Sequence, residues 1–342
     1  MNVHEPEHAP ERRLVTLSDV ARAAGVGEST VSRVLRNQGS FSKRTQDRVA
    51  EAVARLGYVP NRLAGMLAGS GTTAGAKLVG IIIPSLTNIV FPDLLRGANA
   101  ALDRDGFQSV IGVSDYDPER EEALIGALLS WRPAGLIVTG LEHTAGAVAR
   151  LRASGIRIVE MIDTDGAGLD IVVGFSNRSV GRDSARHLLG RGYRRIGYVG
   201  HDITLDLRAA KRLAGFCETL SEAGHPLAER EIAPGPSSAA AGRAALERLL
   251  ARRPDLDAVY FSNDDMALGG YFHCLAQRIA VPGRLALFGF NALDIAAAMP
   301  QPLTTIRTPR LEIGAVAAER LGADGPPEVI DLGYELIPGA TA

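Results

Sequence analysis

The sequence predicts a small all-α head that carries a helix-turn-helix, followed by a large α/β core of two lobes. Near the N-terminus, apolar residues recur at helical spacing in two short segments on either side of Gly25. From Lys77 onward, short apolar strands alternate with helical patterns, which is typical of parallel sheets covered by helices on both faces. The charge changes between the same parts: residues 11–70 hold ten Lys or Arg against five Asp or Glu, whereas residues 71–342 hold 27 against 32. A basic head on an acidic body predicts that the head is the part that binds nucleic acid.

The composition limits the class of protein. The 342 residues, 46% of them hydrophobic and 22% charged, suit a globular protein of about two or three domains. Cys217 and Cys274 lie in helical patterns where packing explains them, and so few thiols are typical of a reducing compartment. The first ten residues lack the apolar segment of a signal peptide, and no apolar run approaches the roughly 20 residues of a membrane span. We therefore expect a cytoplasmic protein in which residues 1–13 form a disordered tail.

The segment 15–36 predicts the first two helices of the head. Gly25 separates them, and its freedom to adopt a positive φ suits a sharp corner. The exposed face of the second helix carries side chains of the kind that contact base edges in the major groove of DNA, namely Glu28, Ser29, Ser32, Arg33 and Arg36. The alternative is a helical hairpin with a solvated polar face.

A third helix follows, from an N-cap at Ser42 to about residue 56. We expect Lys43, Arg44 and Arg48 on this helix to lie near DNA phosphates. Such contacts position a domain on DNA without reading its sequence.

The core consists of apolar strands separated by helical patterns. We expect strands at 78–83, 109–113, 136–139, 158–162, 171–175, 196–199, 258–261 and 285–290. Helices are expected between most of them, for example at 91–104, 118–131, 205–223 and 264–277. Two such parallel sheets in tandem form two lobes with a cleft, and folds of this kind bind ligands at the carboxyl ends of their strands.

Several motifs, in order along the chain, resemble the lac/gal repressor family of bacterial transcription factors. In the head and the segment after it they are Thr16-Leu17-x-Asp19-Val20-Ala21, Gly25-Val26, Ser29-Thr30-Val31-Ser32-Arg33-Val34-Leu35 and Gly57-Tyr58-Val59-Pro60-Asn61-Arg62-Leu63-Ala64. In the core they are Pro84-Ser85-Leu86-Thr87-Asn88, Ser262-Asn263-Asp264-Asp265-Met266-Ala267 and Thr308-Pro309-Arg310. The resemblance implies a head that binds double-stranded operator DNA and a periplasmic-binding-protein-like core that binds a small-molecule effector.

The resemblance also implies boundaries and an assembly. The helix-turn-helix domain would span 14–60, the hinge helix and linker 61–76, and the effector-binding core 78–342. Within the core, the first lobe would comprise about 78–176 and 307–324, and the second about 177–306 and 325–342. A homodimer on a pseudo-palindromic operator is expected, because one helix-turn-helix reads too few base pairs.

The residues implied to contact DNA lie in the head and in the hinge. In the hinge, Leu67 matches the position from which family members wedge a leucine into the minor groove. The full set is Thr16, Glu28, Ser29, Thr30, Ser32, Arg33, Arg36, Asn61, Ala64 and Leu67.

Polar and aromatic side chains near the ends of the predicted core strands are candidates for the effector site. Amides, carboxylates and arginines suit the hydroxyls of a small polyol, an aromatic ring packs on its carbon chain, and an arginine can bind a carboxylate. The candidates are Asn88, Phe91, Tyr116, Glu160, Arg208, Arg212, Asn263 and Asn291. Each could instead be a helix cap or a satisfied loop residue. We expect Asp264 to be an N-cap and Asp115 to cap the turn before Pro118.

Within the family, Leu169-Asp170-Ile171 and Asp331-Leu332-Gly333-Tyr334 most resemble the gluconate-operon repressors. This implies a repressor of sugar-acid catabolism genes that a gluconate-like effector releases from its operator. A neutral sugar or another small metabolite is the alternative effector. The sequence holds no dinucleotide-binding fingerprint, P-loop, nucleophile elbow or metal-ligand spacing. We therefore expect no enzyme activity, no cofactor and no metal site.

Overall fold

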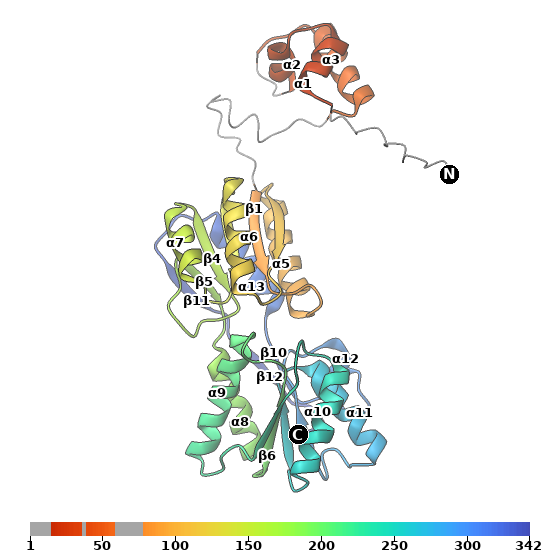
Figure 1. Cartoon of the computed structure of the whole chain (residues 1–342), viewed down its shortest axis with the longest axis vertical. Helices are drawn as coiled ribbons and strands as arrows, with labels where there is room; N and C mark the ends of the chain where they lie inside the picture. The colour runs from red at the N-terminus through yellow and green to blue at the C-terminus, as the bar shows by residue number, and fades with distance from the viewer. Residues whose placement is uncertain (1–14, 36–38, 59–77) are drawn as a thin grey trace, which may run out of the picture. The chain divides into compact units, whose positions relative to one another are not determined.

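A computed structural model describes residues 15–35, 39–58 and 78–342 of the chain (Figure 1). The chain divides into two compact units, Met1–Gly75 and Ala76–Ala342, which we describe separately as the head and the core. None of the helices within the described ranges is both long and apolar enough to cross a membrane.

The head contains three helices, α1 (Leu17–Ala24), α2 (Glu28–Leu35) and α3 (Lys43–Leu56). Their apolar faces pack into one small core centred on Val20, Val31 and Val49, each fully buried. Specific residues cap both ends of α1 and α3. Thr16 forms a capping box with Asp19 at the start of α1, and the Ser42 side chain accepts a hydrogen bond from the backbone N–H of Thr45 at the start of α3.

Gly25 makes the corner between α1 and α2. Its φ of +61° is in the left-handed region, and its N–H donates to the carbonyls of Ala21 and Arg22 at the end of α1. The Arg48 guanidinium of α3 donates to the Gly25 carbonyl at 3.3 Å and thereby holds the third helix against this turn. The predicted helix-turn-helix is confirmed, and Ser42 is the N-cap that the sequence predicts.

The first lobe of the core is built on a six-stranded parallel sheet with the order β11-β5-β4-β3-β1-β2. Its strands are β1 (Leu78–Ile83), β2 (Gln108–Val113), β3 (Gly135–Thr139), β4 (Arg157–Met161), β5 (Ile171–Gly174) and β11 (Glu328–Asp331). The helices of this lobe are α5 (Val90–Arg104), α6 (Pro118–Ser130), α7 (Ala145–Ala153) and α13 (Arg310–Leu321). α5 and α13 cover one face of the sheet, and α6 and α7 cover the other, so both faces are buried.

The second lobe contains a four-stranded parallel sheet with the order β7-β6-β8-β9. Its strands are β6 (Ile196–Gly200), β7 (Glu229–Ile232), β8 (Ala258–Phe261) and β9 (Ala286–Phe288). The helices are α8 (Asn177–Gly190), α9 (Leu207–Glu222), α10 (Ala239–Arg252), α11 (Asp264–Gln277) and the short α12 (Asp294–Ala297). α8 and α9 cover one face of the sheet, and α10 and α11 cover the other.

The chain crosses between the lobes in three places. The first crossing lies between β5 and α8, and the second between β10 (Thr305–Arg307) and α13, both where we expect them. The third expected position, near Gly325, is wrong. β11 pairs in parallel with β5, so residues 328–331 still belong to the first lobe. The chain crosses only between Asp331 and β12 (Glu335–Ile337), which pairs antiparallel with β10.

Candidate functional site

The face of α2 that the sequence assigns to DNA is open to solvent. Glu28, Ser29 and Arg33 are exposed, whereas Thr30 and Ser32 are half-buried. The Thr16 hydroxyl is engaged within the cap of α1, because it donates to Asp19 Oδ2 at 2.7 Å. The remaining predicted DNA contacts, Arg36, Asn61, Ala64 and Leu67, lie outside the described residues.

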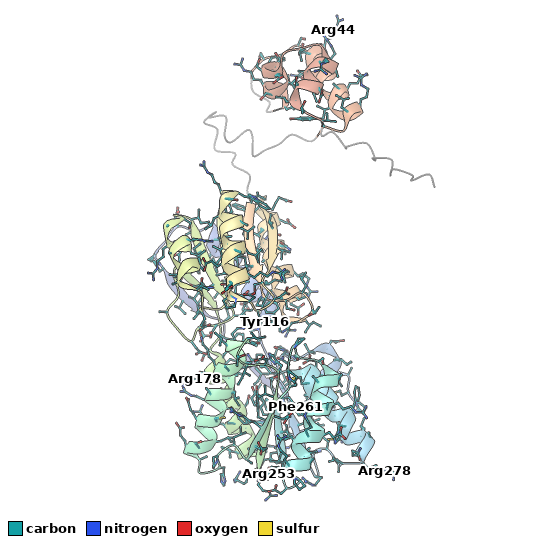
Figure 2. The ribbon with its side chains drawn as sticks, in the orientation of Figure 1. Arg44, Tyr116, Arg178, Arg253, Phe261 and Arg278 are labelled. Atoms are coloured by element: carbon teal, nitrogen blue, oxygen red, sulfur yellow. The ribbon has the colours of Figure 1, made fainter. Side chains whose placement is uncertain are left out.

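The three basic residues expected near phosphates all lie on the first two turns of α3. Lys43 and Arg44 are exposed, and Arg44 points away from the helices of the head (Figure 2). Arg48 is also exposed, but its guanidinium is hydrogen-bonded to Gly25. The head therefore exposes Glu28, Ser29 and Arg33 on α2, and Lys43 and Arg44 on α3.

A cleft between the two lobes of the core is divided into two adjoining chambers. The smaller, which we call the inner chamber, has a free volume of about 30 Å³ and is lined by side chains that include Phe91, Arg208, Arg212, Phe290 and Arg310. The larger, the outer chamber, has a free volume of about 380 Å³, and its lining includes Tyr116, His201, Asp202, Ser237 and Asp265. Asn88, Asp206, Asn263 and Asn291 line both chambers.

The structure brings together all but one of the predicted effector residues. Phe91, Arg208 and Arg212 line the inner chamber and Tyr116 the outer one, while the three asparagines lie where the chambers meet. Tyr116 lies at the boundary between the lobes (Figure 2), and its hydroxyl accepts a hydrogen bond from Asn88 Nδ2 at 3.3 Å.

Glu160 is the exception, and its assignment to the effector site is a correction. Strand β4 alternates its side chains between the two faces of the sheet, and Glu160 points to the face covered by α6 and α7. Its carboxylate is fully buried, accepts the backbone N–H of Leu169 and lies 3.3 Å from His143 Nε2. It lines neither chamber.

Arg212 is a buried guanidinium whose contacts are with uncharged groups. It is 5% exposed, donates to Asn177 Oδ1 at 2.8 Å, and its Cζ lies 3.9 Å from the centre of the Phe290 ring. No carboxylate within the described core pairs with it, and its Nε has no hydrogen-bond partner there. A buried charge without a counter-ion is costly unless a ligand supplies one.

Arg208, one helical turn before Arg212 on α9, is already neutralised. Its Nη2 lies 3.2 Å from Asp206 Oδ1, and Asp206 Oδ2 lies 3.3 Å from His201 Nε2. Burial opposes ionisation of Asp206, but the neighbouring Arg208, together with the hydrogen bond from His201, outweighs it and holds the pKa of this carboxyl below its ordinary value. Asp206, the N-cap of α9, thus neutralises the charge of Arg208.

Asn291 has a strained backbone at the meeting point of the chambers. Its φ is +116°, and its carbonyl accepts a hydrogen bond from Arg310 across the lobes. Its Nδ2 donates to Asn263 Oδ1 at 3.1 Å, whereas its buried Oδ1 has no partner within the described residues. Ile162, Asp115 and Tyr116, which also line the cleft, have positive φ as well. Such strain concentrates at functional sites.

Two expected caps are corrected. Asn263, not Asp264, is the N-cap of α11, and the Asp264 side chain accepts bonds from Thr305 Oγ1 and the Leu293 N–H. Burial raises the pKa of Asp264 to about 6. Asp117, not Asp115, caps the helix that begins at Pro118.

The structure adds residues that our prediction omits. Arg310 enters the inner chamber from the start of α13, and Asp206 and His201 come from the loop between β6 and α9. Lys211 reaches across the cleft and pairs with Asp163 and with Glu142 at 2.5 Å. The motif Thr308-Pro309-Arg310 is a signal that could have identified Arg310, whereas Lys211 has none in the sequence.

Two family profiles match the chain. The profile described as "Bacterial regulatory proteins, lacI family" matches residues 16–61, and "Periplasmic binding proteins and sugar binding domain of LacI family" matches residues 76–324. The HTH-type transcriptional regulator GntR of Pseudomonas aeruginosa is 40% identical over 329 residues, which are 94% of this chain and 94% of that protein. GntR of Escherichia coli (strain K12) is 35% identical over 337 residues, 97% of this chain and 99% of that protein.

Among solved structures, a LacI-family transcriptional regulator from Silicibacter pomeroyi has a TM-score of 0.87 and 44% identity, covering 96% of this chain and 99% of that one. The lac repressor dimer bound to operator and the anti-inducer ONPF has a TM-score of 0.76 and 26% identity, with the same coverage of 96% and 99%. Because both profiles match in order and the relatives match over nearly the whole chain, this protein belongs to the lacI family of bacterial regulatory proteins and is a DNA-binding transcriptional regulator with an effector-binding core, not an enzyme.

Proposed function

We propose that this regulator represses genes of sugar-acid catabolism and that a gluconate-like sugar acid binds in the cleft and releases it from its operator. The observation that supports an acidic effector best is Arg212, a buried guanidinium with uncharged partners at the end of the inner chamber. A carboxylate would supply its missing counter-ion through charge-assisted hydrogen bonds. The relatives named GntR, at 35% and 40% identity, support the same class of effector.

The rest of the cleft suits the carbon chain of a sugar acid. Amide donors and acceptors for hydroxyl groups come from Asn88, Asn263 and Asn291. The Oδ1 of Asn291, which has no hydrogen-bond partner within the described residues, can accept a hydrogen bond from a hydroxyl group of the ligand. Phe91, which is 1% exposed, supplies an apolar wall. A few polar groups on an otherwise apolar pocket are typical of small-molecule sites.

On DNA we propose a homodimer in which α2 of each subunit enters a major groove. Arg33 would contact guanine and Glu28 would accept from cytosine N4, while Lys43 and Arg44 contact phosphates. Leu67 would wedge into the minor groove between the half-sites. Action on the chromosome of a bacterium would place the protein in the cytoplasm.

Effector and operator would be coupled through the relative position of the two lobes. Lys211 and Arg310 already connect the lobes, so the cleft has cross-lobe contacts that a ligand between them would strengthen. A ligand that prefers the closed arrangement stabilises it by its differential affinity, and by linkage the operator then binds less tightly.

The test is calorimetry with gluconate, its lactone and glucose, three six-carbon polyhydroxylated ligands of which only gluconate is charged. We expect gluconate to bind far more tightly, because only gluconate carries an anionic group for Arg212. Arg212→Ala should lower the affinity for gluconate by roughly 2–5 kcal/mol, as for a broken buried ion pair. Equal affinities for gluconate and glucose would refute the sugar-acid proposal and favour a neutral effector.

A further inference from the structure

Some charged side chains of the cleft have no oppositely charged partner among the described residues. The positive one lies in the inner chamber, and the negative ones lie in the outer chamber. In the inner chamber, the pairs Arg208–Asp206 and Arg310–Asp93 neutralise two of the three arginines, with distances of 3.2 and 3.0 Å. The third, Arg212, has none. The inner chamber therefore holds one uncompensated positive charge.

The outer chamber has the opposite character. Its described lining includes four aspartates and no lysine or arginine. Asp206 and Asp115 are compensated by arginines, namely Arg208 and Arg120. Asp202 and Asp265 form no ion pair within the described core. This leaves two uncompensated negative charges that face the outer chamber.

Both of these carboxylates are held by neutral donors. Asp202 Oδ1 accepts from the hydroxyl and the N–H of Thr204 at 2.6 and 2.9 Å, and the hydroxyl bond in particular lowers the pKa of this carboxyl. The two oxygens of Asp265 accept from Ser237 Oγ at 2.5 and 2.6 Å, and the Met266 N–H donates to Oδ1 at 2.8 Å. Each carboxylate keeps lone pairs that can accept hydroxyl groups of a ligand.

From this separation we propose that the cleft selects a sugar acid with a single negative charge, bound with its carboxylate at Arg212 and its hydroxyl-bearing end toward Asp202 and Asp265. The two aspartates accept hydrogen bonds from a neutral terminal hydroxyl and repel a second anionic group. Phosphorylated sugar acids and sugar diacids, which carry such a group at the far end, are excluded. This inference rests on the proposed sugar-acid function and defines the effector class more narrowly.

The proposed selectivity arises from electrostatic repulsion of the wrong ligand rather than from an additional contact with the right one. A ligand with a second anionic group would keep the attraction of its carboxylate to Arg212, but the second group would lie beside the carboxylates of Asp202 and Asp265. Specificity is a difference between two affinities, and repulsion of the wrong ligand contributes to it as much as attraction of the right one. A neutral polar wall would not discriminate in this way.

The experiment is calorimetry of the full-length protein with gluconate, 6-phosphogluconate and glucarate. These three ligands share a carboxylate and a six-carbon chain and differ at the sixth carbon. We expect the two ligands with a second anionic group to bind at least about tenfold more weakly than gluconate, because that group is repelled by the two carboxylates. Raising the salt concentration from about 0.1 M to about 1 M, which shortens the screening length from about 10 Å to about 3 Å, should reduce this ratio.

The paired variants are Asp202→Asn and Asp265→Asn, which keep a side-chain acceptor and remove one charge. Each should raise the affinity for 6-phosphogluconate several-fold relative to the affinity for gluconate, because the repulsion of the second anionic group is reduced. Glu222→Gln, at the exposed end of α9, is the matched control and should change neither. Because misfolding would lower the affinity for every ligand, an increased affinity for 6-phosphogluconate cannot result from misfolding.

The outcomes separate the two proposals. If gluconate does not bind the wild-type protein, the proposed function fails. If gluconate binds but 6-phosphogluconate and glucarate bind equally well, or if the two Asn variants leave the ratio unchanged, the selection by Asp202 and Asp265 is refuted while the sugar-acid function stands.

Discussion

At the residue scale, His143 and Arg212 are two buried bases in contrasting surroundings. The His143 ring has no exposed surface and lies between two carboxylates, with Nδ1 2.6 Å from Glu121 Oε1 and Nε2 3.3 Å from Glu160 Oε1. Arg212 instead contacts neutral groups. The charge of the first group is compensated by carboxylates within the fold, whereas that of the second has no ion-pair partner among the described residues.

The His143 cluster predicts a pH dependence of stability. Burial lowers the pKa of His143, but the hydrogen bond that its ring donates to Glu121 and the nearby carboxylate of Glu160 outweigh this effect and raise the pKa to about 9. The charged histidine therefore stabilises the fold fully below its unfolded pKa of about 6.5, and this contribution is lost as the pH rises to about 9. It is on the order of 3 kcal/mol. His143→Gln should remove the corresponding slope from urea unfolding at pH 6 to 9, and an unchanged slope would contradict the assignment.

On the DNA side, Arg33 is the residue most suited to direct reading of a base. It is exposed on the second turn of α2, where a guanidinium can reach guanine O6 and N7. Arg33→Ala should cost on the order of 1–3 kcal/mol at the cognate operator and relax specificity at one position. Operator titrations at fixed salt measure both effects. Arg22→Ala, an exposed arginine of α1 paired with Asp19, is the control. Unchanged affinity in Arg33→Ala would exclude this contact.

The sequence could predict the type of most site residues but not where each side chain points. Arg208 and Arg212 lie on one face of one helix, and this relation follows from their spacing alone. Glu160 lies on a strand, where neighbouring side chains point to opposite faces of the sheet. An error of one position therefore places a side chain on the wrong face, and the burial of Glu160 beside His143 could not be anticipated. Lys211 contacts residues about 50 to 70 positions earlier, a tertiary relation without local pattern.

At the element scale, α5 and α13 form the closest helix contact of the first lobe, although the sequence separates them by about 200 residues (Figure 1). Two glycines make this approach possible. A Cβ on Gly97 would lie 2.0 Å from the Leu311 carbonyl oxygen, and one on Gly314 would lie 2.0 Å from that of Leu94. Because Arg310 is the first residue of α13 and Phe91 lies in the first turn of α5, this contact also positions two residues of the inner chamber.

Gly314→Ala should therefore destabilise the core and weaken effector binding. The helices must separate to admit the methyl group, and overpacking of this kind costs roughly 1–3 kcal/mol. Gly190→Ala is the matched control, since a Cβ there meets nothing within 4 Å and should leave stability unchanged or slightly higher. Thermal unfolding of the two variants tests this, and equal melting temperatures would mean that the close contact is not required.

Element boundaries follow from the sequence where the cap is strong, as at Ser42 before α3. They fail for β11. The run Gly325-Pro326-Pro327 before it has the composition of a linker, and an edge strand of four residues with alternating exposure carries little apolar signal. Its place in the first sheet is decided by pairing with β5, which the local sequence does not encode.

At the scale of the whole molecule, the core can transmit a ligand signal because its lobes are joined by few and specific contacts. Three chain segments cross between the lobes, and Lys211 and Arg310 add polar contacts across the cleft. A ligand between Arg212 of the second lobe and Phe91 of the first would bind the closed arrangement most tightly. Effector binding in the core can change operator affinity only if closure of the lobes changes the relative position of the two heads of the dimer.

The most direct test of this account is an operator-binding titration with and without gluconate at fixed salt. For the wild-type protein we predict that gluconate lowers operator affinity by about 5- to 150-fold, the usual range of allosteric coupling, and that glucose does not. Arg212→Gln should bind the operator normally and show no response to gluconate. Operator affinity that gluconate leaves unchanged in the wild-type protein, or that glucose lowers equally, would contradict the claim that this regulator responds to a sugar acid through Arg212.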